Sequence, residues 1–115
     1  MKIDQFEDMI IWQKSKVLSL LVYSKFRSCK DYSFRDQIQR ASVSIMNNSA
    51  EGFERRSNKE LKNFLFIAKG SCGEVRSMLH LSLELKYLSG EEYKELMDYA
   101  MSISRMISAF IKKLN

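Results

Sequence analysis

No proline occurs anywhere in the chain, so nothing in the sequence forbids long helices. Glycine, the other strong helix breaker, occurs only four times in 115 residues. The dipeptides Asn-Gly and Asp-Gly, which favour hairpin turns, are absent, and apolar and polar residues never alternate for long enough to indicate a strand. These observations predict an all-α fold.

Apolar residues recur at helical spacing in four segments. We expect these segments to be helices over residues 6–29, 33–55, 57–86 and 89–113. Ser33, Ser57 and Ser89 suit the N-caps of the last three, because each is followed three positions later by an acidic residue. The short connections are typical of an antiparallel up-down-up-down four-helix bundle. A chain of this length can bury one core, so we expect a single domain over residues 1–115.

Two of the expected helices carry more than one apolar stripe. In the first helix we expect Ile10, Val17, Leu21 and Ser24 to form a core stripe, which is widened by Ile11, Leu18 and Val22. The main seam of the third helix is formed by Leu61, Leu65, Ala68, Cys72, Val75 and Leu79. A second seam beside it is formed by Phe64, Ile67, Ser71, Met78, Leu81 and Leu85. A third flank is formed by Phe66, Gly70, Gly73 and Ser77.

The third helix is therefore apolar over much of its circumference. Such a helix is either central in its own subunit or buried a second time against another copy of the chain. A glycine inside a helix costs about 1 kcal/mol relative to alanine. We therefore expect a closely approaching helix at Gly52, Gly70 and Gly73.

Composition and termini indicate a soluble protein. Hydrophobic residues make up 45% and charged residues 29% of the chain, and no run reaches the roughly 18 apolar residues of a membrane span. The first eight residues are too acidic for a signal peptide. We expect a cytoplasmic location, in which Cys29 and Cys72 are reduced thiols without ligand or disulfide partners.

Residues 40–56 carry polar and very small residues on the face that the helical period turns inward. Polar groups on a core stripe destabilise the fold unless they are hydrogen-bonded. We expect a buried or half-buried network between the second and third helices, in which Arg40 or Arg55 pairs with Glu51 or Glu74. The full set is Arg40, Asn48, Glu51, Arg55, Ser71 and Glu74. Such a network would fix the register of the two helices, and a ligand site is the alternative.

These central segments resemble a known family. The matching blocks are residues 37–45, Asn48, residues 50–53, 55–61, 64–71 and 74–75, and residues 6–9 and 11–14 at the start of the chain. They are similar to bacterial four-helix bundle proteins encoded in intervening sequences of 23S rRNA genes, and the similarity covers essentially the whole chain. The chain departs from the family pattern at Met46, Ser49 and Glu54, where the family often has proline, a branched apolar residue and glycine. Whether the second helix bends near Met46 is therefore open.

The resemblance implies a left-handed bundle that assembles as a ring, with a homopentamer as the expected state. Relatives include the accessory variability determinant of diversity-generating retroelements, a basic pentameric barrel that associates with a reverse transcriptase and with nucleic acid. Many other members have no assigned activity.

Positive charge is concentrated around the start of the third helix. The cations are Arg55, Arg56, Lys59, Lys62, Lys69 and Arg76. Acidic residues outnumber cations between residues 84 and 98, although the net charge of the chain is +5. A solvated helix face is one interpretation. The other is a ring of cations that binds the phosphates of RNA or DNA, or docks a protein that handles nucleic acid.

Catalytic chemistry has little support in the sequence. His80 is the only histidine, and Glu84 one turn later is its nearest acidic neighbour along the helix. A di-iron bundle needs two Glu-x-x-His motifs, and none is present. We therefore expect a non-enzymatic, self-assembling protein without metal or cofactor. The alternative is a purely structural or protein-interaction module that does not bind nucleic acid.

Overall fold

The computed structural model describes residues 3–55 and 57–114 and is all-α, as predicted. It contains a short 3-10 helix, η1 (Phe6–Asp8), and the helices α1 (Ile10–Lys25), α2 (Tyr32–Glu54), α3 (Asn58–Glu84) and α4 (Gly90–Lys113). No strand occurs among the described residues. α2 continues without a break past Met46, where the family often has proline.

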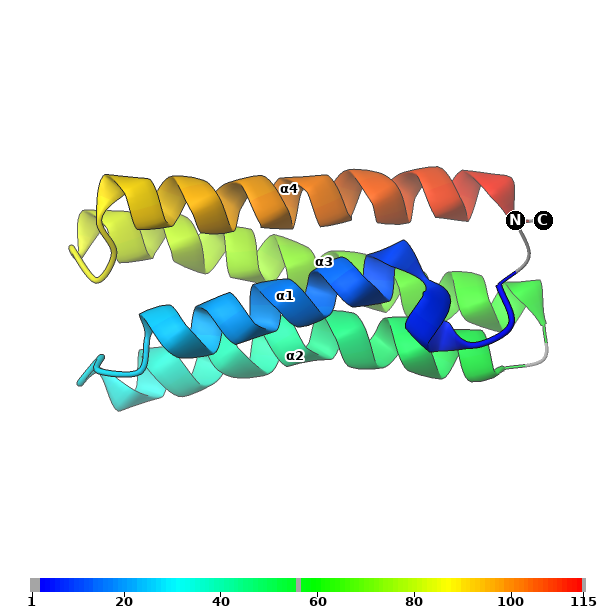
Figure 1. The fold of residues 1–115 in the computed structure, drawn as a ribbon, viewed down its shortest axis with the longest axis horizontal. Coiled ribbons are helices and arrows are strands. Elements are labelled where there is room, and N and C mark those ends of the chain that lie inside the picture. The colour runs from blue at the N-terminus through cyan, green and yellow to red at the C-terminus, as the bar shows by residue number, and fades with distance from the viewer. Residues whose placement is uncertain (1–2, 56, 115) are drawn as a thin grey trace.

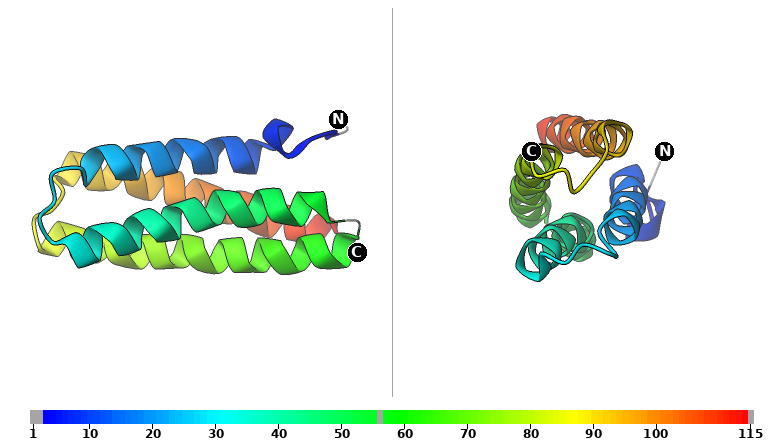
Figure 2. Two further views of the ribbon diagram at one scale, coloured as in Figure 1. Left: turned by 90° about the horizontal axis from the view of Figure 1, so that it is seen from below. Right: turned by 90° about the vertical axis from the view of Figure 1, so that its left-hand side faces the viewer.

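Consecutive helices run in opposite directions along a bundle that measures 42 × 21 × 19 Å (Figure 1). α1 packs against α2 and α4, and α3 packs against the same two helices, with the most extensive interface between α2 and α3. α1 and α3 therefore occupy diagonal corners of the bundle, as the end-on view in Figure 2 shows. The left-handed twist and the single domain over residues 1–115 stay predictions.

The prediction of one helix over residues 6–29 is wrong at both ends. Met9 adopts an extended backbone (φ −74°, ψ 125°) between η1 and α1, and its side chain is only 1% exposed. The break thus allows a large apolar side chain to enter the core at the start of α1. The helix ends at Lys25, before the fully buried Phe26.

The core stripe of α1 also differs from the prediction. Ile11, Leu18 and Val22, expected only to widen that stripe, are buried, whereas Ile10 is 59% exposed and Val17 37% exposed. The buried side includes Ser15, whose hydroxyl donates to the carbonyl oxygen of Ile11 at 2.7 Å. A small, internally satisfied residue allows a neighbouring helix to approach, which apolar periodicity alone does not reveal. Ile10 and Val17 of the predicted stripe are consequently left outside, whereas Leu21 is partly buried against the core.

The helix ends depend on local hydrogen bonds. Ser57 accepts from the backbone N–H of Glu60, and Ser89 and Glu92 form a full capping box, as predicted. α2 is instead capped by Asp31, which accepts from the N–H of Phe34 at 3.2 Å, so the expected cap Ser33 lies inside the helix.

The third helix ends two residues earlier than predicted, because Lys86 has a left-handed backbone (φ 62°). The Tyr87 N–H then donates to the Ser82 carbonyl, and the Lys86 N–H donates to that of Leu83. Together these bonds form a Schellman motif, which terminates a helix.

One end of the bundle is closed by contacts between its two connections. Tyr87, after α3, donates its hydroxyl to the carboxylate of Asp31, before α2, at 2.7 Å. This hydrogen bond raises the pKa of Tyr87. The Phe34 ring lies 6.0 Å from that of Phe26 and 5.3 Å from that of Tyr87. The connection between α1 and α2 is thereby tied to the connection between α3 and α4.

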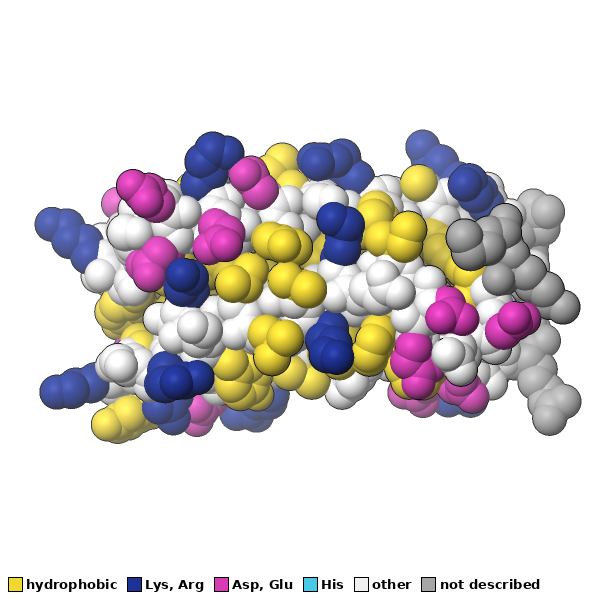
Figure 3. Space-filling model, viewed as in Figure 1, with side chains coloured by type: hydrophobic (Ala, Val, Ile, Leu, Met, Phe, Trp, Pro, Cys, Tyr) yellow, Lys and Arg dark blue, Asp and Glu magenta, His cyan; other side chains and the backbone are white. Residues whose placement is uncertain are grey.

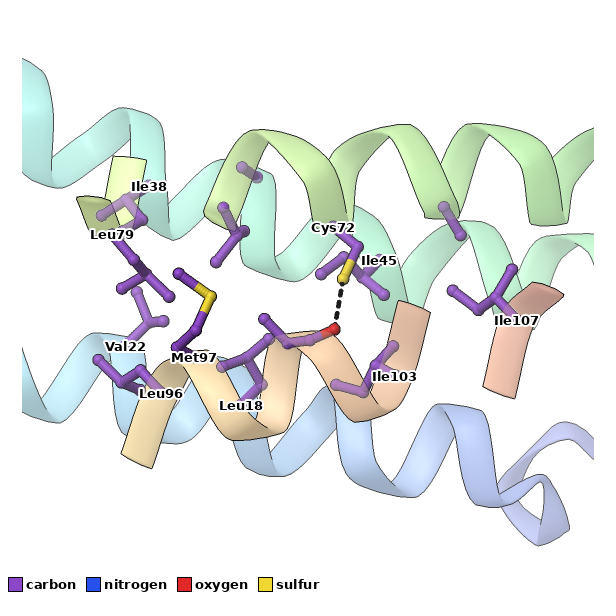
Figure 4. Close-up of a cluster of buried hydrophobic side chains, with 14 of the residues drawn as sticks. Leu18, Val22, Ile38, Ile45, Cys72, Leu79, Leu96, Met97, Ile103 and Ile107 are labelled. Atoms are coloured by element: carbon purple, nitrogen blue, oxygen red, sulfur yellow. Dashed lines mark hydrogen bonds between the residues drawn. The ribbon is translucent and has the colours of Figure 1, made fainter. Parts of the chain in front are cut away.

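The core is a continuous cluster to which all four α-helices contribute (Figure 4). All six residues of the predicted main seam of α3 are buried. Near the middle of the cluster, the Cys72 thiol donates to the carbonyl oxygen of Ala100 at 3.0 Å. α3 thus contacts both of its neighbours through a stripe that was identifiable from helical spacing.

α2 lies very close to α3 at Gly52. A Cβ atom built there would lie 2.8 Å from the Cβ of Phe64 and 3.1 Å from a methyl group of Leu61. One turn earlier, Ser49 is buried and donates its hydroxyl to the Ile45 carbonyl at 2.8 Å. Small residues on this face of α2 therefore allow the α2–α3 contact.

We predict that Gly52→Ala destabilises the protein by about 1–3 kcal/mol, because the added methyl group overpacks the α2–α3 contact. Gly90→Ala is the matched control, since no atom lies within 4 Å of a Cβ at that position. It should be neutral or stabilise by up to about 1 kcal/mol through helix propensity. Urea denaturation followed by circular dichroism measures both. Equal effects of the two substitutions would show that helix propensity, and not packing, decides the result.

Candidate functional site

The cations proposed from the sequence lie along α3 and at the end of α2. Lys59 and Lys69 are exposed, and Lys62 and Arg76 are half-buried. Lys62, Lys69 and Arg76 follow one another at intervals of seven residues, so they form one stripe along the helix. Arg56 lies outside the described residues.

Arg55 differs from the other cations because its charge is already engaged. Its guanidinium forms an ion pair with Glu51 at 2.8 Å and a longer one with Glu60 at 3.8 Å. The same group lies 4.8 Å from the centre of the Phe64 ring. Exposed ion pairs of this kind add little stability, but they leave Arg55 less available for a ligand than the lysines.

α4 extends the basic surface, which sequence reasoning missed. Because Cys72 of α3 contacts Ala100 of α4, and the two helices are antiparallel, the C-terminal half of α4 lies beside the N-terminal half of α3. This half of α4 adds three exposed cations, Arg105, Lys112 and Lys113. Pairing the charges of the two helices in an antiparallel hairpin would have revealed this arrangement from the sequence. Hereafter the basic surface means Lys59, Lys62, Lys69, Arg76, Arg105, Lys112 and Lys113.

The opposite half of the α3–α4 hairpin is acidic. It carries Glu84, Glu91, Glu92, Glu95 and Asp98. Lys94 donates to Asp98 at 2.8 Å, which raises the pKa of Lys94. In Figure 3, acidic side chains gather near the N-terminal end of α4, and lysines and arginines predominate toward its C-terminal end. Charge is thus divided along the length of the α3–α4 hairpin.

The residues of the expected polar network fall into separate groups. Ser44 and Ser71 link α2 to α3 through a 2.8 Å hydrogen bond, and Asn48 donates to the carbonyl and hydroxyl oxygens of Ser44. Glu74 accepts from Gln37 at 3.1 Å on an exposed part of the same interface.

One of the expected charged pairs, Arg55 with Glu51, does form, but it is exposed and not part of a buried network between the two helices. Glu51 pairs with Arg55 on the surface of the molecule, within four residues along the chain. Arg40 forms no ion pair with a residue that the structure describes. It lines an open hollow between α2 and α3. The polar residues therefore supply a small hydroxyl–amide bridge and two surface contacts.

α1 and α3 each present an apolar face to solvent. On α3, Gly70 and Gly73 have no atom within 4 Å of an added Cβ, so no helix of the same subunit approaches them. Phe66 beside them is 53% exposed, and Ile67 and Leu81 are also exposed. The α1 face contains Ile10, Val17 and Leu20. Figure 3 shows hydrophobic side chains gathered where α1 and α4 meet.

Chemically reactive groups do not converge on one place. Cys29 and Cys72 are both free thiols. The Tyr93 hydroxyl lies 3.2 Å from Nδ1 of His80. Residues 3–55 and 57–114 contain no group of three or more histidine, cysteine or acidic residues that could hold a metal ion. None of the described helices combines the length and hydropathy needed to cross a membrane.

Comparisons with known proteins identify a family and a fold. A family model for the 23S rRNA-intervening sequence protein matches residues 7–109. The chain is also similar to a crystal structure of a protein with unknown function from the S23 ribosomal protein family of Bacteroides thetaiotaomicron VPI-5482. The TM-score is 0.84 with 23% sequence identity, covering 90% of this chain and 99% of that chain. No curated protein matches the sequence. Neither match indicates a family of enzymes.

We predict a pH-dependent loss of stability that depends on Cys72. Burial raises the pKa of its thiol from 9.0 to about 11, against the opposing effects of the nearby Arg76 charge and a backbone hydrogen bond from Ser104. The folded state therefore holds the proton more tightly than the unfolded state, and stability falls as the pH rises from about 9 to about 11.

The loss should amount to about 2 kcal/mol. It is measured by urea denaturation at several pH values. Cys72→Ser lacks a group that titrates in this range and should lack this part of the pH dependence. A parallel decline of both proteins would show that ionisation of Cys72 does not contribute.

Proposed function

Because the chain belongs to the 23S rRNA-intervening sequence protein family, we propose that it is a non-enzymatic, self-assembling bundle that binds the phosphate backbone of nucleic acid. It would act in the cytoplasm, either alone or by docking a protein that handles nucleic acid, such as a reverse transcriptase. The family name does not decide among these roles, so the proposal rests on the arrangement of charge and apolar surface in this chain.

The basic surface is the observation that carries the proposal. Six of its seven cations come from adjacent halves of two antiparallel helices, in which Glu60 is the single acidic residue, and Arg76 lies just beyond, two residues from Glu74. Lysine and arginine that neutralise phosphates release counterions from nucleic acid, which gives sequence-independent affinity. Repeating the surface in each subunit of an oligomer would multiply the number of phosphates bound.

The side chains present favour contacts with the backbone over base recognition. Phe66 is the exposed aromatic residue between Lys62 and Lys69, and every member of the basic surface is a lysine or an arginine. Binding by stacking uses several aromatic platforms in succession. We therefore propose that the protein binds RNA and DNA mainly through charge.

Self-association is supported by the apolar faces of α1 and α3. Large exposed apolar patches on a small protein are typical of interaction sites. The structure leaves Ile10, Val17, Phe66 and Ile67 on its surface although the core is complete without them. We propose a homopentamer, the state that the family resemblance implies.

We predict that native mass spectrometry and light scattering give five times the mass of one chain. The physical reason is that the exposed faces on α1 and α3 are covered only when copies associate. A mass equal to one chain at micromolar concentration would contradict self-assembly. A dimer, or an oligomer with another number of subunits, would contradict the pentamer but not self-assembly.

We also predict that the double variant Lys62→Ala/Lys69→Ala binds a short RNA or DNA duplex more weakly than the native protein. Its affinity should depend less on salt, because the log–log slope falls by about one unit for each phosphate that the variant no longer neutralises. Fluorescence anisotropy at low and moderate salt measures both effects.

The matched control is Lys30→Ala/Lys86→Ala, which removes the same charge from exposed positions at the opposite end of the bundle. It should bind nearly as well as the native protein. Equal losses of affinity in the two double variants would show that only net charge matters. No binding by the native protein at low salt would favour the alternative of a purely structural or protein-interaction module.

A further inference from the structure

The apolar faces of α1 and α3 differ in shape. The face on α1 carries the branched side chains of Ile10 and Val17, and the face on α3 carries Phe66 followed by the bare backbone of Gly70 and Gly73. One face protrudes where the other is notched. Two faces that differ in this way fit each other better than either fits itself.

We infer that copies of the chain join head to tail, with the Ile10–Val17 stripe of one copy lying along the Phe66–Gly73 stripe of the next. The inference rests on the proposed self-assembly and specifies the surfaces that produce it. Because α1 and α3 occupy diagonal corners, each copy can use both faces at once. Contacts between unlike surfaces generate rings when the rotation closes, whereas a contact of one surface with itself stops at a dimer.

The two stripes lie at the same height in the bundle. Lys14 of α1 lies over the ring of Tyr99 on α4, and the next residue, Ala100, contacts Cys72 of α3. Further along, Lys25 pairs with Glu95, close to Tyr93, which contacts His80. The first contact places Lys14 beside Gly73, and the second places Lys25 beside Met78. Val17 therefore lies within about one helical turn of Gly73 in height, and Ile10 within about one turn of Phe66.

The spacing and direction of the stripes also match. Ile10 and Val17 are seven residues apart, as are Phe66 and Gly73, so both pairs follow the repeat by which parallel helices pack. α1 and α3 run in the same direction (Figure 1). In a ring whose axis follows the bundles, α1 of one copy would lie parallel to α3 of the next, and the Val17 side chain would fill the space above Gly73.

Charge is complementary beside this contact. Lys16 precedes Val17 and lies on the flank of α1 turned away from α4. Glu74 follows Gly73 on the flank of α3 turned toward α2, where it contacts Gln37. When Val17 lies on Gly73, these two flanks meet. The Lys16 ammonium, which now lies 5.5 Å from the centre of the Trp12 ring, would then be able to reach the Glu74 carboxylate.

Both stripes are tilted toward α4, which gives the ring its curvature. Ile10 and Val17 are four and three residues from Lys14, which contacts Tyr99 of α4. Phe66 and Gly73 continue at the same interval to His80, which contacts Tyr93 of α4. Contact faces tilted to one side close a ring toward that side. The inference therefore places α4 on the inner wall and α2 on the outer wall.

Disulfide trapping tests the contact. In a Cys29→Ser background, one chain carries Val17→Cys and another Gly73→Cys. The two proteins are unfolded in urea, mixed, refolded together and oxidised. The buried Cys72, whose pKa is raised to about 11, should not react. We expect covalent dimers from the mixture and none from either protein alone. A chain with both substitutions should give a ladder up to the closed ring.

Matched controls make the outcomes distinct. Lys30→Cys mixed with Gly73→Cys should give no covalent dimer, because Lys30 lies outside both stripes. Dimers formed by Val17→Cys alone, or by Gly73→Cys alone, would overturn the head-to-tail arrangement. If native mass spectrometry shows an oligomer but no mixture forms covalent dimers, the inference about the contact is overturned and self-assembly is not. A monomeric native protein would overturn both.

A charge exchange provides a second test that does not depend on oxidation. Lys16→Glu and Glu74→Lys should each raise the concentration needed for half-assembly about tenfold, because each places like charges together. The double variant should restore assembly to near the native level. Failure of the double variant to improve on the two single variants would show that these residues do not meet.

Discussion

The α2–α3 interface is the contact on which the rest of the bundle depends. It is the most extensive helix pair in the molecule, and it passes through Gly52, where a single added carbon would collide with Phe64. Close approach here allows the main seam of α3 to lie between its two neighbours. The opposite side of α3 does not pack against another helix of the subunit, and its residues Phe66, Gly70 and Gly73 are exposed to solvent. Internal packing and the outer apolar face are thus two results of one arrangement.

Much of this fold could be predicted from the sequence, and the errors have physical causes. The structure confirms the all-α fold predicted from the absence of proline, the N-caps at Ser57 and Ser89, and the buried seam of α3. Each of these predictions depends on a local property of the sequence. The core stripe predicted for α1 is wrong because this helix is apolar on more than one face and small serines decide which face is buried. The cap at Asp31 and the break at Met9 depend on tertiary contacts that spacing does not encode.

The candidate site was only partly predictable for a related reason. Lys62 and Lys69 were identifiable because their charges lie close together along one helix. Arg105 and its neighbours on α4 join them only through the antiparallel hairpin, so spacing along the chain does not reveal them. Helical spacing placed Glu51 and Arg55 on one face, and their pairing was among those expected, but spacing does not show whether such a pair is buried between two helices. In the structure, Arg55 satisfies its charge one turn away on its own helix, as exposed side chains commonly do.

The hydrogen bond between Tyr87 and Asp31 has a consequence for how the molecule opens. It joins the two connections at one end of the bundle, where Phe26 and Phe34 also pack, so neither connection can loosen without breaking contacts of the other. Backbone amides at that end should therefore exchange their hydrogens with solvent together and slowly, as one cooperative unit.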